Sequence, residues 1–252
     1  MADNVKMQHR QRKLRARFAE TPADVQSALT LRRTSFFNGV GVIDGDEFDH
    51  RCLHVLIEDS ETTELLCCYR LLPLSSGPDV MTSYSAQFYD LSALSKFSGS
   101  MLEVGRFCIA ANARDPNVLR AAWAVMTKYV DELNIELLFG CSSFKGTDAR
   151  AHLESFSLLA DCHLAPKLWL PKVKAAKVFH FASKQKSFTD RAKALRKMPP
   201  LLKTYLSMGG WVSNHAVVDY EMNTMHVFTG LEVKNIPAAR KRLLRVIAAQ
   251  MA

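Results

Sequence analysis

Four acidic side chains crowd into six positions early in the chain, in the segment Asp44-Gly45-Asp46-Glu47-Phe48-Asp49. Carboxylates this close together attract cations, so the segment is a candidate rim for a metal ion or for the ammonium group of a substrate. The spacing does not complete the EF-hand pattern, so an ammonium group is the better candidate and we predict no metal site. An ordinary solvated surface loop is the competing interpretation.

Arg70 interrupts an apolar run that extends from Leu65 to Leu72. A guanidinium group on a buried strand needs a partner, because an unpaired charge in the interior is costly. Its planar fork also matches the two oxygens of a carboxylate. The sequence leaves two interpretations open for Arg70: a structural ion pair, or a clamp for the carboxylate of a substrate.

Glu103 and Arg106 lie three residues apart in a second strand-like run, Leu102–Ile109. In a regular strand, residues at this spacing point to opposite faces of the sheet. A β-bulge between them would turn them toward one another and would open the sheet locally. A carboxylate in a partly dry cleft can act as a general base, whereas the alternative interpretation is a buried ion pair.

An ordered series of strands and helices must position these clusters. Apolar patterns predict strands near residues 13–19, 53–58, 64–72, 102–110, 135–144, 178–181, 211–219 and 226–233. Capping residues and prolines predict helices near 21–37, 115–133, 148–159 and 200–208, and a basic C-terminal amphipathic helix at about 237–250. This order favours a single α+β domain, 1–252, with a central mixed twisted sheet flanked by helices. We expect a loop at 73–78, and a loop or insertion at 166–177.

The bulk composition is that of an ordinary globular protein of the cytoplasm. Of its 252 residues 48% are hydrophobic and 23% are charged, and no apolar run approaches the roughly 20 residues that a transmembrane helix needs. The basic N-terminal residues are not followed by an apolar stretch, so no signal peptide is expected. The six cysteines form no metal-ligand spacing and are expected to be reduced core thiols. A cysteine nucleophile is the minor alternative.

Ten cationic residues and one acid, Asp190, lie between Lys167 and Lys197, in a chain of formal net charge +8. A field of this sign attracts an anionic partner, such as nucleic acid, an anionic lipid surface or an acidic protein. No zinc-finger, RNP or helix-turn-helix pattern accompanies the basic run, so nucleic acid is not expected. A solvated basic face is the alternative.

The clusters occur in an order and spacing that resemble one branch of the GNAT-like acyltransferases, the acyl-homoserine-lactone synthases and the ornithine-lipid N-acyltransferases. The matching positions are an Arg-x-x-x-Phe helix end, the acid loop, a core-strand arginine, an aromatic residue and the Glu-x-x-Arg strand: Arg32, Phe36, Asp44, Asp46, Asp49, Arg70, Phe88, Glu103 and Arg106. The likeness to the ornithine-lipid members is closer and extends over about residues 28–235. It includes Leu138-Phe139-Gly140-Cys141 and Pro199-Pro200-Leu201-Leu202.

The resemblance implies a GNAT-like fold whose sheet splays between the strand of Glu103 and the strand near 135–144. The V-shaped cleft would admit the phosphopantetheine arm of an acyl carrier protein, and the acyl chain would run into the apolar interior. Family members transfer a 3-hydroxyacyl group from that thioester to the α-amine of L-ornithine and make a lyso-ornithine lipid. No cofactor other than the donor's own phosphopantetheine thioester is then expected.

Attack of an amine on a thioester requires a neutral amine, a proton acceptor and donors for the carbonyl oxyanion. Glu103 is the candidate base, Arg106 and Arg70 complete the expected catalytic set, and backbone N–H groups at the bulge are candidate oxyanion donors. The substrate-binding candidates are one arginine, three acids and two aromatic residues: Arg32, Asp44, Asp46, Asp49, Phe36 and Phe88. The arginines would hold a carboxylate and the acids a distal ammonium group, or the acids would pair with the arginines instead.

The expected partners are an acyl carrier protein, an amino-acid substrate and the anionic inner face of the cytoplasmic membrane. A carrier protein is acidic and the product is amphiphilic, so both suit a basic surface. Three alternatives stay open. The chain could be an acyl-homoserine-lactone synthase that uses S-adenosylmethionine, an N-acyltransferase acting on glutamine or another amino acid, or a non-catalytic module that binds acyl carrier protein.

Overall fold

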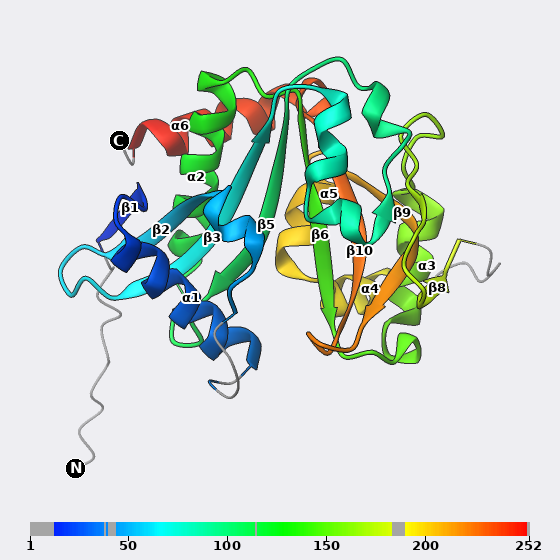
Figure 1. Ribbon diagram of the computed structural model, residues 1–252, viewed down its shortest axis with the longest axis horizontal. Helices are drawn as coiled ribbons and strands as arrows, with labels where there is room; N and C mark the ends of the chain where they lie inside the picture. Colours follow the sequence, from blue (N-terminus) through cyan, green and yellow to red (C-terminus); the bar gives the residue numbers. More distant parts are fainter. Residues whose placement is uncertain (1–12, 38, 40–43, 114, 183–189, 251–252) are drawn as a thin grey trace, which may run out of the picture.

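The computed structural model describes residues 13–37, 39, 44–113, 115–182 and 190–250 (Figure 1). Its main sheet has eight strands in the order β1-β2-β3-β5-β6-β10-β9-β8. Their bounds are β1 Leu14–Phe18, β2 Leu53–Asp59, β3 Leu65–Leu74, β5 Met101–Ile109, β6 Leu137–Lys145, β8 Val178–His180, β9 Trp211–Asp219 and β10 Thr224–Glu232. Only β5 and β6 are parallel neighbours, and the other adjacent pairs are antiparallel. The predicted α+β class with a mixed sheet is confirmed.

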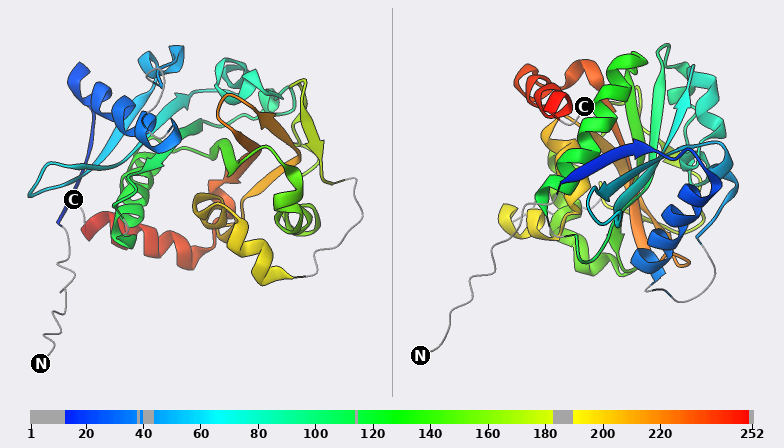
Figure 2. Two further views of the ribbon diagram at one scale, coloured as in Figure 1. Left: turned by 90° about the horizontal axis from the view of Figure 1, so that it is seen from below. Right: turned by 90° about the vertical axis from the view of Figure 1, so that its left-hand side faces the viewer.

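Helices cover both faces of this sheet (Figure 2). Their bounds are α1 Pro22–Phe37, α2 Pro116–Glu132, α3 Leu153–Cys162, α4 Arg191–Lys197, α5 Pro200–Ser207 and α6 Ala238–Gln250. Helix α1 packs near Leu56 and Cys68, whereas α2 packs on the other face with Ile57 and Tyr69, as the alternation of side chains along β2 and β3 requires. In the described part of the chain, none of the helices combines the length and apolarity needed to cross a bilayer.

Residues 75–97 form an additional layer over one end of the α1 face; we call this segment the insert. It consists of three short 3₁₀ turns, Gly77–Thr82, Ser85–Gln87 and Leu94–Lys96, and of strand β4, Tyr89–Asp90. Strand β4 pairs with β7, Lys172–Val173, in a separate two-stranded sheet. The insert buries apolar side chains such as Tyr89 against Phe139 and Phe228 of the main sheet, so it has a core that fixes its position.

The structure corrects several expected boundaries. Strand β3 continues to Leu74, so Pro73, which we expected in a loop, is a strand residue. This is tolerated because β2 pairs with β3 only as far as Leu71, and the missing N–H of Pro73 leaves no broken ladder bond on that side. Neither β4, β7 nor α4 was predicted. The helix expected near 148–159 begins as a 3₁₀ turn and ends later, at Cys162.

Three of the six cysteines lie in the core as expected, while Cys52 and Cys141 are half-buried. All six are free, and Cys67, Cys68 and Cys108 are buried core thiols. Cys162 is exposed, because it lies at the last residue of α3. The expectation of a core thiol was therefore wrong at this position.

Candidate active site

A β-bulge on β5 sets the geometry of the charged cluster. Cys68 on β3 faces Cys108 on β5. Arg70, two residues further along β3, faces Gly105, which is three residues from Cys108, so β5 contains one extra residue. Arg106 lies in this bulge, and its backbone φ of +51° falls in the left-handed region that residues other than glycine rarely adopt. The predicted bulge is confirmed.

The bulge brings Arg106 and Glu103 to the same turn of the insert. Nη1 of Arg106 donates a hydrogen bond to Oη of Tyr84 over 3.1 Å, and its guanidinium carbon lies 4.8 Å from the centroid of the Tyr84 ring. The backbone N–H of Tyr84 donates to the carboxylate of Glu103 over 2.9 Å. Glu103 and Arg106 therefore meet around Tyr84, a residue that the sequence did not single out.

Glu103 is almost fully buried, with 4% of its surface exposed. Ser85 donates to it twice, from the backbone N–H over 2.7 Å and from Oγ over 2.6 Å. Burial raises the pKa of Glu103 and outweighs these hydrogen bonds from Ser85 and Tyr84, which act in the opposite direction. A carboxyl group with a raised pKa is better matched to accepting a proton near neutral pH, and the same contacts fix the turn of the insert against β5.

The acid loop pairs with two arginines beneath the surface. Nε of Arg32 bonds Asp44 over 2.7 Å, and its Nη1 bonds Asp49 over 2.6 Å. Nη1 of Arg70 bonds Asp49 over 2.8 Å, and its Nη2 bonds Asp46 over 2.9 Å. Arg32 and Arg70 are both buried. The structure thus places these two arginines in structural ion pairs, one of the interpretations that the sequence left open.

Burial and ion pairing oppose each other in the carboxylates of this network. Burial would raise the pKa of Asp49, but hydrogen bonds from Arg32 and from the backbone of Asp46 lower the pKa to about 2. Burial of Asp46 is likewise outweighed, mainly by its hydrogen bond from Arg70, so its pKa lies below the ordinary value. Both carboxylates are therefore ionised at neutral pH and hold the arginines in place.

A cavity of about 910 Å³ opens beside this network. Its walls come from the end of α1, the acid loop, the insert, β5, the segment that precedes β8 and the hairpin between β9 and β10. Four of the predicted site residues line it, namely Asp44, Asp46, Phe88 and Arg106. Four others lie behind its wall, namely Arg32, Asp49, Arg70 and Glu103.

Phe36 is the predicted residue that belongs neither to the cavity wall nor to the polar contacts behind it. It packs with the small core cluster around Leu56 and Cys68, and its neighbour Phe37 lines the cavity instead. One step along a helix turns a side chain by about 100°. An aromatic residue at the end of α1 does line the cavity, but it is Phe37, because Phe36 lies on the face of the helix that packs on the sheet.

Some residues of the cavity wall were not predicted. Tyr84 lies four residues before Phe88, and the two ring centroids are 5.3 Å apart; this aromatic pair is a signal that the sequence does contain. Asp219 and Glu221 enter from the β9–β10 hairpin. Acidic residues are common in turns, so nothing in the sequence marks these two as part of a site.

Carboxylates outnumber cations on the wall of this cavity. Its acids are Asp44, Asp46, Glu47, Asp219 and Glu221, and its cations are Arg106 and Lys177. The cavity is therefore acid-lined although the whole chain carries a formal net charge of +8. Asp44 and Asp46 are paired with arginines, so the excess negative charge comes from Glu47, Asp219 and Glu221. Such a wall suits a small ligand that has more positive than negative charge.

Strands β5 and β6 diverge along their length (Figure 1), and Arg106 of β5 lines the cavity where they have parted. Their parallel pairing comprises three residue pairs, from Met101 with Leu137 to Glu103 with Phe139. Gly140 follows on β6, and a Cβ atom at this position would collide with the carbonyl oxygen of Val104. The splay that we expected after Glu103 is present, and it starts where glycine allows the two backbones to touch.

Comparison with known proteins identifies the family. Residues 33–124 match the family described as acetyltransferase (GNAT) domain. The chain is 30% identical over 226 residues to an L-ornithine N(alpha)-acyltransferase of Rhodobacter capsulatus. The aligned region covers 84% of this chain and 86% of that protein. The chain belongs to the L-ornithine N(alpha)-acyltransferase family. A protein of the same name from Brucella abortus is 29% identical over 240 residues, covering 88% of this chain and 85% of the relative.

The resemblance inferred from the sequence is thereby confirmed, and the protein is an acyltransferase. Among solved structures, the apo form of TofI matches with a TM-score of 0.50 at 14% identity, covering 93% of this chain and 99% of that chain. That likeness concerns the fold alone. Together with the GNAT match it supports the expected GNAT-like fold.

A nucleophilic role is disfavoured for Cys141 and Cys52, the two half-buried cysteines. Sγ of Cys141 lies 3.5 Å from Oγ of Ser85, next to Glu103. Burial raises the pKa of Cys141 to about 12, and burial also raises the pKa of Cys52 to about 12. Both thiols are thus protonated at neutral pH, whereas the thiolate is the nucleophilic form.

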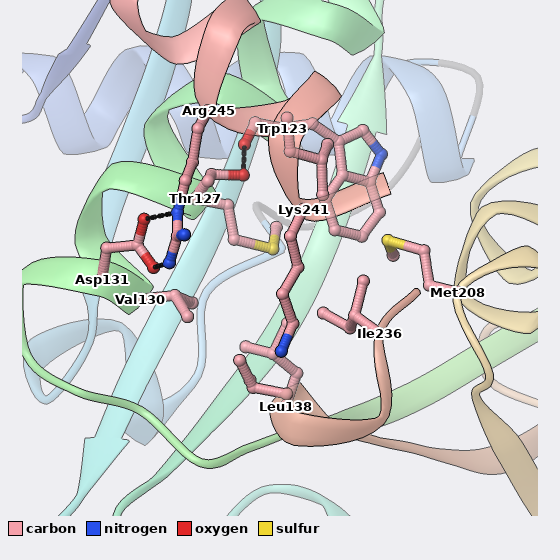
Figure 3. Close-up of a pocket in the computed structure, with 12 residues that line it drawn as sticks. Trp123, Thr127, Val130, Asp131, Leu138, Met208, Ile236, Lys241 and Arg245 are labelled. Atoms are coloured by element: carbon pink, nitrogen blue, oxygen red, sulfur yellow. Dashed lines mark hydrogen bonds and ion pairs between the residues drawn. The ribbon is translucent and has the colours of Figure 1, made fainter. Parts of the chain in front are cut away.

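A second, smaller cavity lies between α2 and α6 (Figure 3). Its walls are mostly apolar and include Trp123, Leu138 and Met208. At its edge Arg245 of α6 donates to the carboxylate of Asp131 on α2 over 2.8 and 2.9 Å. None of the predicted site residues lines this cavity, so it suits hydrocarbon better than acyl-transfer chemistry.

Proposed function

We propose that the protein transfers a 3-hydroxyacyl group from acyl carrier protein to the α-amine of L-ornithine and so makes a lyso-ornithine lipid. The observation that carries this proposal is the acid-lined cavity with Arg106 in its wall, beside the splay of β5 and β6. The name of the matched relatives supports ornithine as the acceptor. The resemblance of the motifs and the charge at the start of α2 support a carrier-protein donor.

The charges of L-ornithine match the wall of the cavity. Arg106 is the best candidate for its carboxylate, because its ion pairs to Asp46 and Asp44 are longer, at 3.2 and 3.4 Å, than those that occupy Arg32 and Arg70. The distal ammonium group would lie near the carboxylates of the β9–β10 hairpin. The α-amine would then face the gap between β5 and β6.

The reaction forms a C–N bond and breaks the C–S bond of the thioester. In our proposal Glu103 takes the proton of the α-ammonium group through a water molecule or through the hydroxyl of Ser85. Backbone N–H groups at the bulge would stabilise the oxyanion. Burial raises the pKa of Tyr84 despite the nearby Arg106, so Tyr84 keeps its proton and would donate it to the leaving thiolate. The second proton, which the nitrogen loses as the C–N bond forms, would return to Tyr84.

The start of α2 favours a carrier-protein donor over free coenzyme A. This helix follows β5, at the open end of the splay, and its N-terminus is the natural site for a diphosphate. The carboxylate of Asp115 already accepts the N–H of Asn117 there, over 2.8 Å. A diphosphate would be repelled by this carboxylate. The phosphopantetheine arm of acyl carrier protein ends in a phosphodiester with a single negative charge, so repulsion by Asp115 would be weaker than for the diphosphate of coenzyme A.

The apolar cavity beneath α6 would hold the end of the acyl chain. Leu138 lines it and pairs with Leu102, immediately before the strands part. A chain that passes between β5 and β6 would therefore reach this side of the sheet. The methionines Met126 and Met208 in the wall would adapt to chains of differing length.

Product analysis tests the proposed activity. The protein is incubated with 3-hydroxyacyl carrier protein and, separately, with L-ornithine, L-glutamine or S-adenosylmethionine, and the products are identified by mass spectrometry. We expect thiol release and an Nα-acylated amino acid with ornithine. A lactone from S-adenosylmethionine, an acylated glutamine, or carrier binding without thiol release would each replace our proposal by one of the alternatives.

Replacement of the candidate base tests the proposed mechanism. Because a general base contributes about 10²–10⁴-fold, Glu103→Gln should lower kcat by that factor and abolish the rise of kcat/KM with pH. Glu64→Gln, at an exposed residue of the same type, is the matched control and should behave like the wild type. A Glu103→Gln protein that keeps its turnover and its pH profile would contradict a role as base.

A further inference from the structure

One segment beside the cavity exposes apolar and cationic side chains together. We call residues 166–177 the rim loop, because Ala175, Ala176 and Lys177 at its end line the cavity. Leu168 is 63% exposed and Val173 is 43% exposed. Isolated exposed apolar residues are common, but the twelve-residue loop also contains four lysines, Lys167, Lys172, Lys174 and Lys177, and no acid.

Contacts with the insert hold the rim loop in place, and they fix the outward direction of Leu168 and Val173. Its strand β7 pairs with β4 of the insert. Nζ of Lys174 donates to the carbonyl oxygen of Ala86 over 2.6 Å, and the N–H of Ala175 donates to the carbonyl oxygen of Phe88 over 3.0 Å. Trp169 packs on Phe97 with 5.4 Å between ring centroids. Anchoring of this kind turns the neighbouring Leu168 toward solvent.

Exposed aliphatic side chains flanked by lysines fit the surface of an anionic bilayer. The aliphatic groups enter the boundary between headgroups and acyl chains, while lysine heads stay among the lipid phosphates. An acidic protein would cover Leu168 and Val173 only if it presented an apolar patch matched to them in shape, whereas a bilayer offers phosphates and apolar chains at any contact point. We propose that the rim loop docks on an anionic membrane, with these two side chains inserted and with Lys167 and Lys172 on the headgroups.

This inference rests on the proposed function, since a lyso-lipid product must leave the enzyme for a bilayer. The rim loop borders the cavity in which the amino acid would be acylated. Docking there would shorten the path of the amphiphile from the cleft to the membrane. Exposed apolar area on a distant surface would give no such advantage.

Helix α6 offers a matched comparison. It also exposes two aliphatic residues, Leu243 at 48% and Val246 at 52%, beside the exposed cations Arg240 and Arg242. The second half of α6 nevertheless lies at the other end of the molecule from the rim loop, which is yellow-green in the ribbon views (Figures 1 and 2). No residue of α6 lines the acid-lined cavity.

Co-sedimentation with vesicles separates the two surfaces. The wild type, the double variant Leu168→Ser/Val173→Ser and the control Leu243→Ser/Val246→Ser are mixed with vesicles of phosphatidylcholine and phosphatidylglycerol, or of phosphatidylcholine alone. We expect binding of the wild type to the anionic vesicles, a loss of about tenfold in affinity for the rim-loop variant, and no change for the α6 variant. Thermal unfolding of each variant shows that the fold is retained.

Two further measurements complete the test. Lys167→Gln/Lys172→Gln should weaken binding to anionic vesicles by about tenfold, and added salt should weaken wild-type binding. Turnover of soluble acyl carrier thioester and ornithine should be unchanged in Leu168→Ser/Val173→Ser. Wild-type affinity of the rim-loop variants, a loss confined to the α6 variant, or no binding of the wild type would overturn the inference. If membrane binding behaves as expected but ornithine is not acylated, the proposed function fails and the docking surface stands.

Discussion

Arg106 is the residue that connects the ion-pair network to the cavity. Its backbone occupies the bulge with φ of +51°, and its side chain contacts Tyr84 and Asp46 over 3.1 and 3.2 Å. Arg32 and Arg70 are buried and held by shorter contacts. Of the three arginines, Arg106 alone lines the cavity, so it is the one available to a substrate carboxylate.

Arg106→Lys tests this assignment. Lysine keeps the positive charge but lacks the planar fork, so the KM for ornithine should rise about tenfold or more, with a smaller change in kcat. Initial rates at varied ornithine concentration measure both parameters. The same substitution at the exposed Arg120 is the control. An unchanged KM would show that the substrate carboxylate binds elsewhere.

Asp49 should make the stability of the protein depend on acid pH. Its pKa is about 2 in the folded protein against an ordinary value of 3.8, so its contribution to the free energy of unfolding is complete above about pH 4 and is lost as the pH falls toward 2. Asp49→Asn leaves Arg32 and Arg70 without a shared anion and should cost about 3–5 kcal/mol at neutral pH. Denaturant unfolding between pH 2 and 7 should then show a weaker acid dependence in the variant than in the wild type. Parallel curves for the two proteins would contradict this role.

The sequence was sufficient to locate the charged residues but not to divide their tasks. The spacing of Glu103 and Arg106 in a regular strand predicts opposite faces, and only the resemblance to a known family, with a bulge between them, placed the two together. Arg32 and Arg70 are of the same residue type as Arg106, and only the distances to Asp44, Asp46 and Asp49 separate structural ion pairs from a free clamp. Phe36 was misplaced because the pattern of α1 does not determine which face of its last turn reaches the cavity.

Among the elements, the pair β5 and β6 determines whether there is a cleft at all. Their pairing ends at Glu103 and Phe139, and Gly140 lies against the carbonyl oxygen of Val104. Any side chain at Gly140 must push the strands apart or distort the bulge. Gly140 therefore keeps the two backbones in contact immediately before the strands part.

Gly140→Ala should destabilise the protein by about 1–3 kcal/mol, because the added methyl group is overpacked against backbone that cannot rotate away. Turnover should fall as well, since the displaced strand carries the edge of the cleft. Chemical denaturation measures the first effect and thiol release the second. Ser143→Ala, at an exposed residue of the same strand, is the control. If Gly140→Ala is as stable as the wild type, the two strands can move apart without cost, and the prediction is contradicted.

Regular elements were predictable from the sequence, and the insert was not. Strands such as β5 and β6 have long apolar runs, and α2 has a proline at its start and an N-capping Asp115. Residues 75–97 form 3₁₀ turns of three to six residues, which are too short to show a period. The insert nevertheless supplies Tyr84 and the backbone that holds Glu103. Strands β4 and β7, of two residues each, were missed for the same reason.

For the molecule as a whole, the sign of the net charge is opposite to that of the cavity. The chain has a formal charge of +8, yet acids dominate the wall because folding brings the loop of Asp44 and Asp46 close to the hairpin of Asp219 and Glu221. A basic exterior would attract an acidic carrier or an anionic membrane, while the acidic interior would select the amine substrate. No pattern in the sequence shows that these distant acids share one cavity.

Selection of a distal ammonium group is the central claim of this account, and one comparison of substrates tests it most directly. L-Norvaline has the same carbon chain as L-ornithine but lacks the distal amine. With acyl carrier thioester held constant, we expect kcat/KM to be about a hundredfold higher for ornithine than for norvaline, and we expect this ratio to collapse in Asp219→Asn/Glu221→Gln. Equal kcat/KM values for the two amino acids in the wild-type protein would contradict the account.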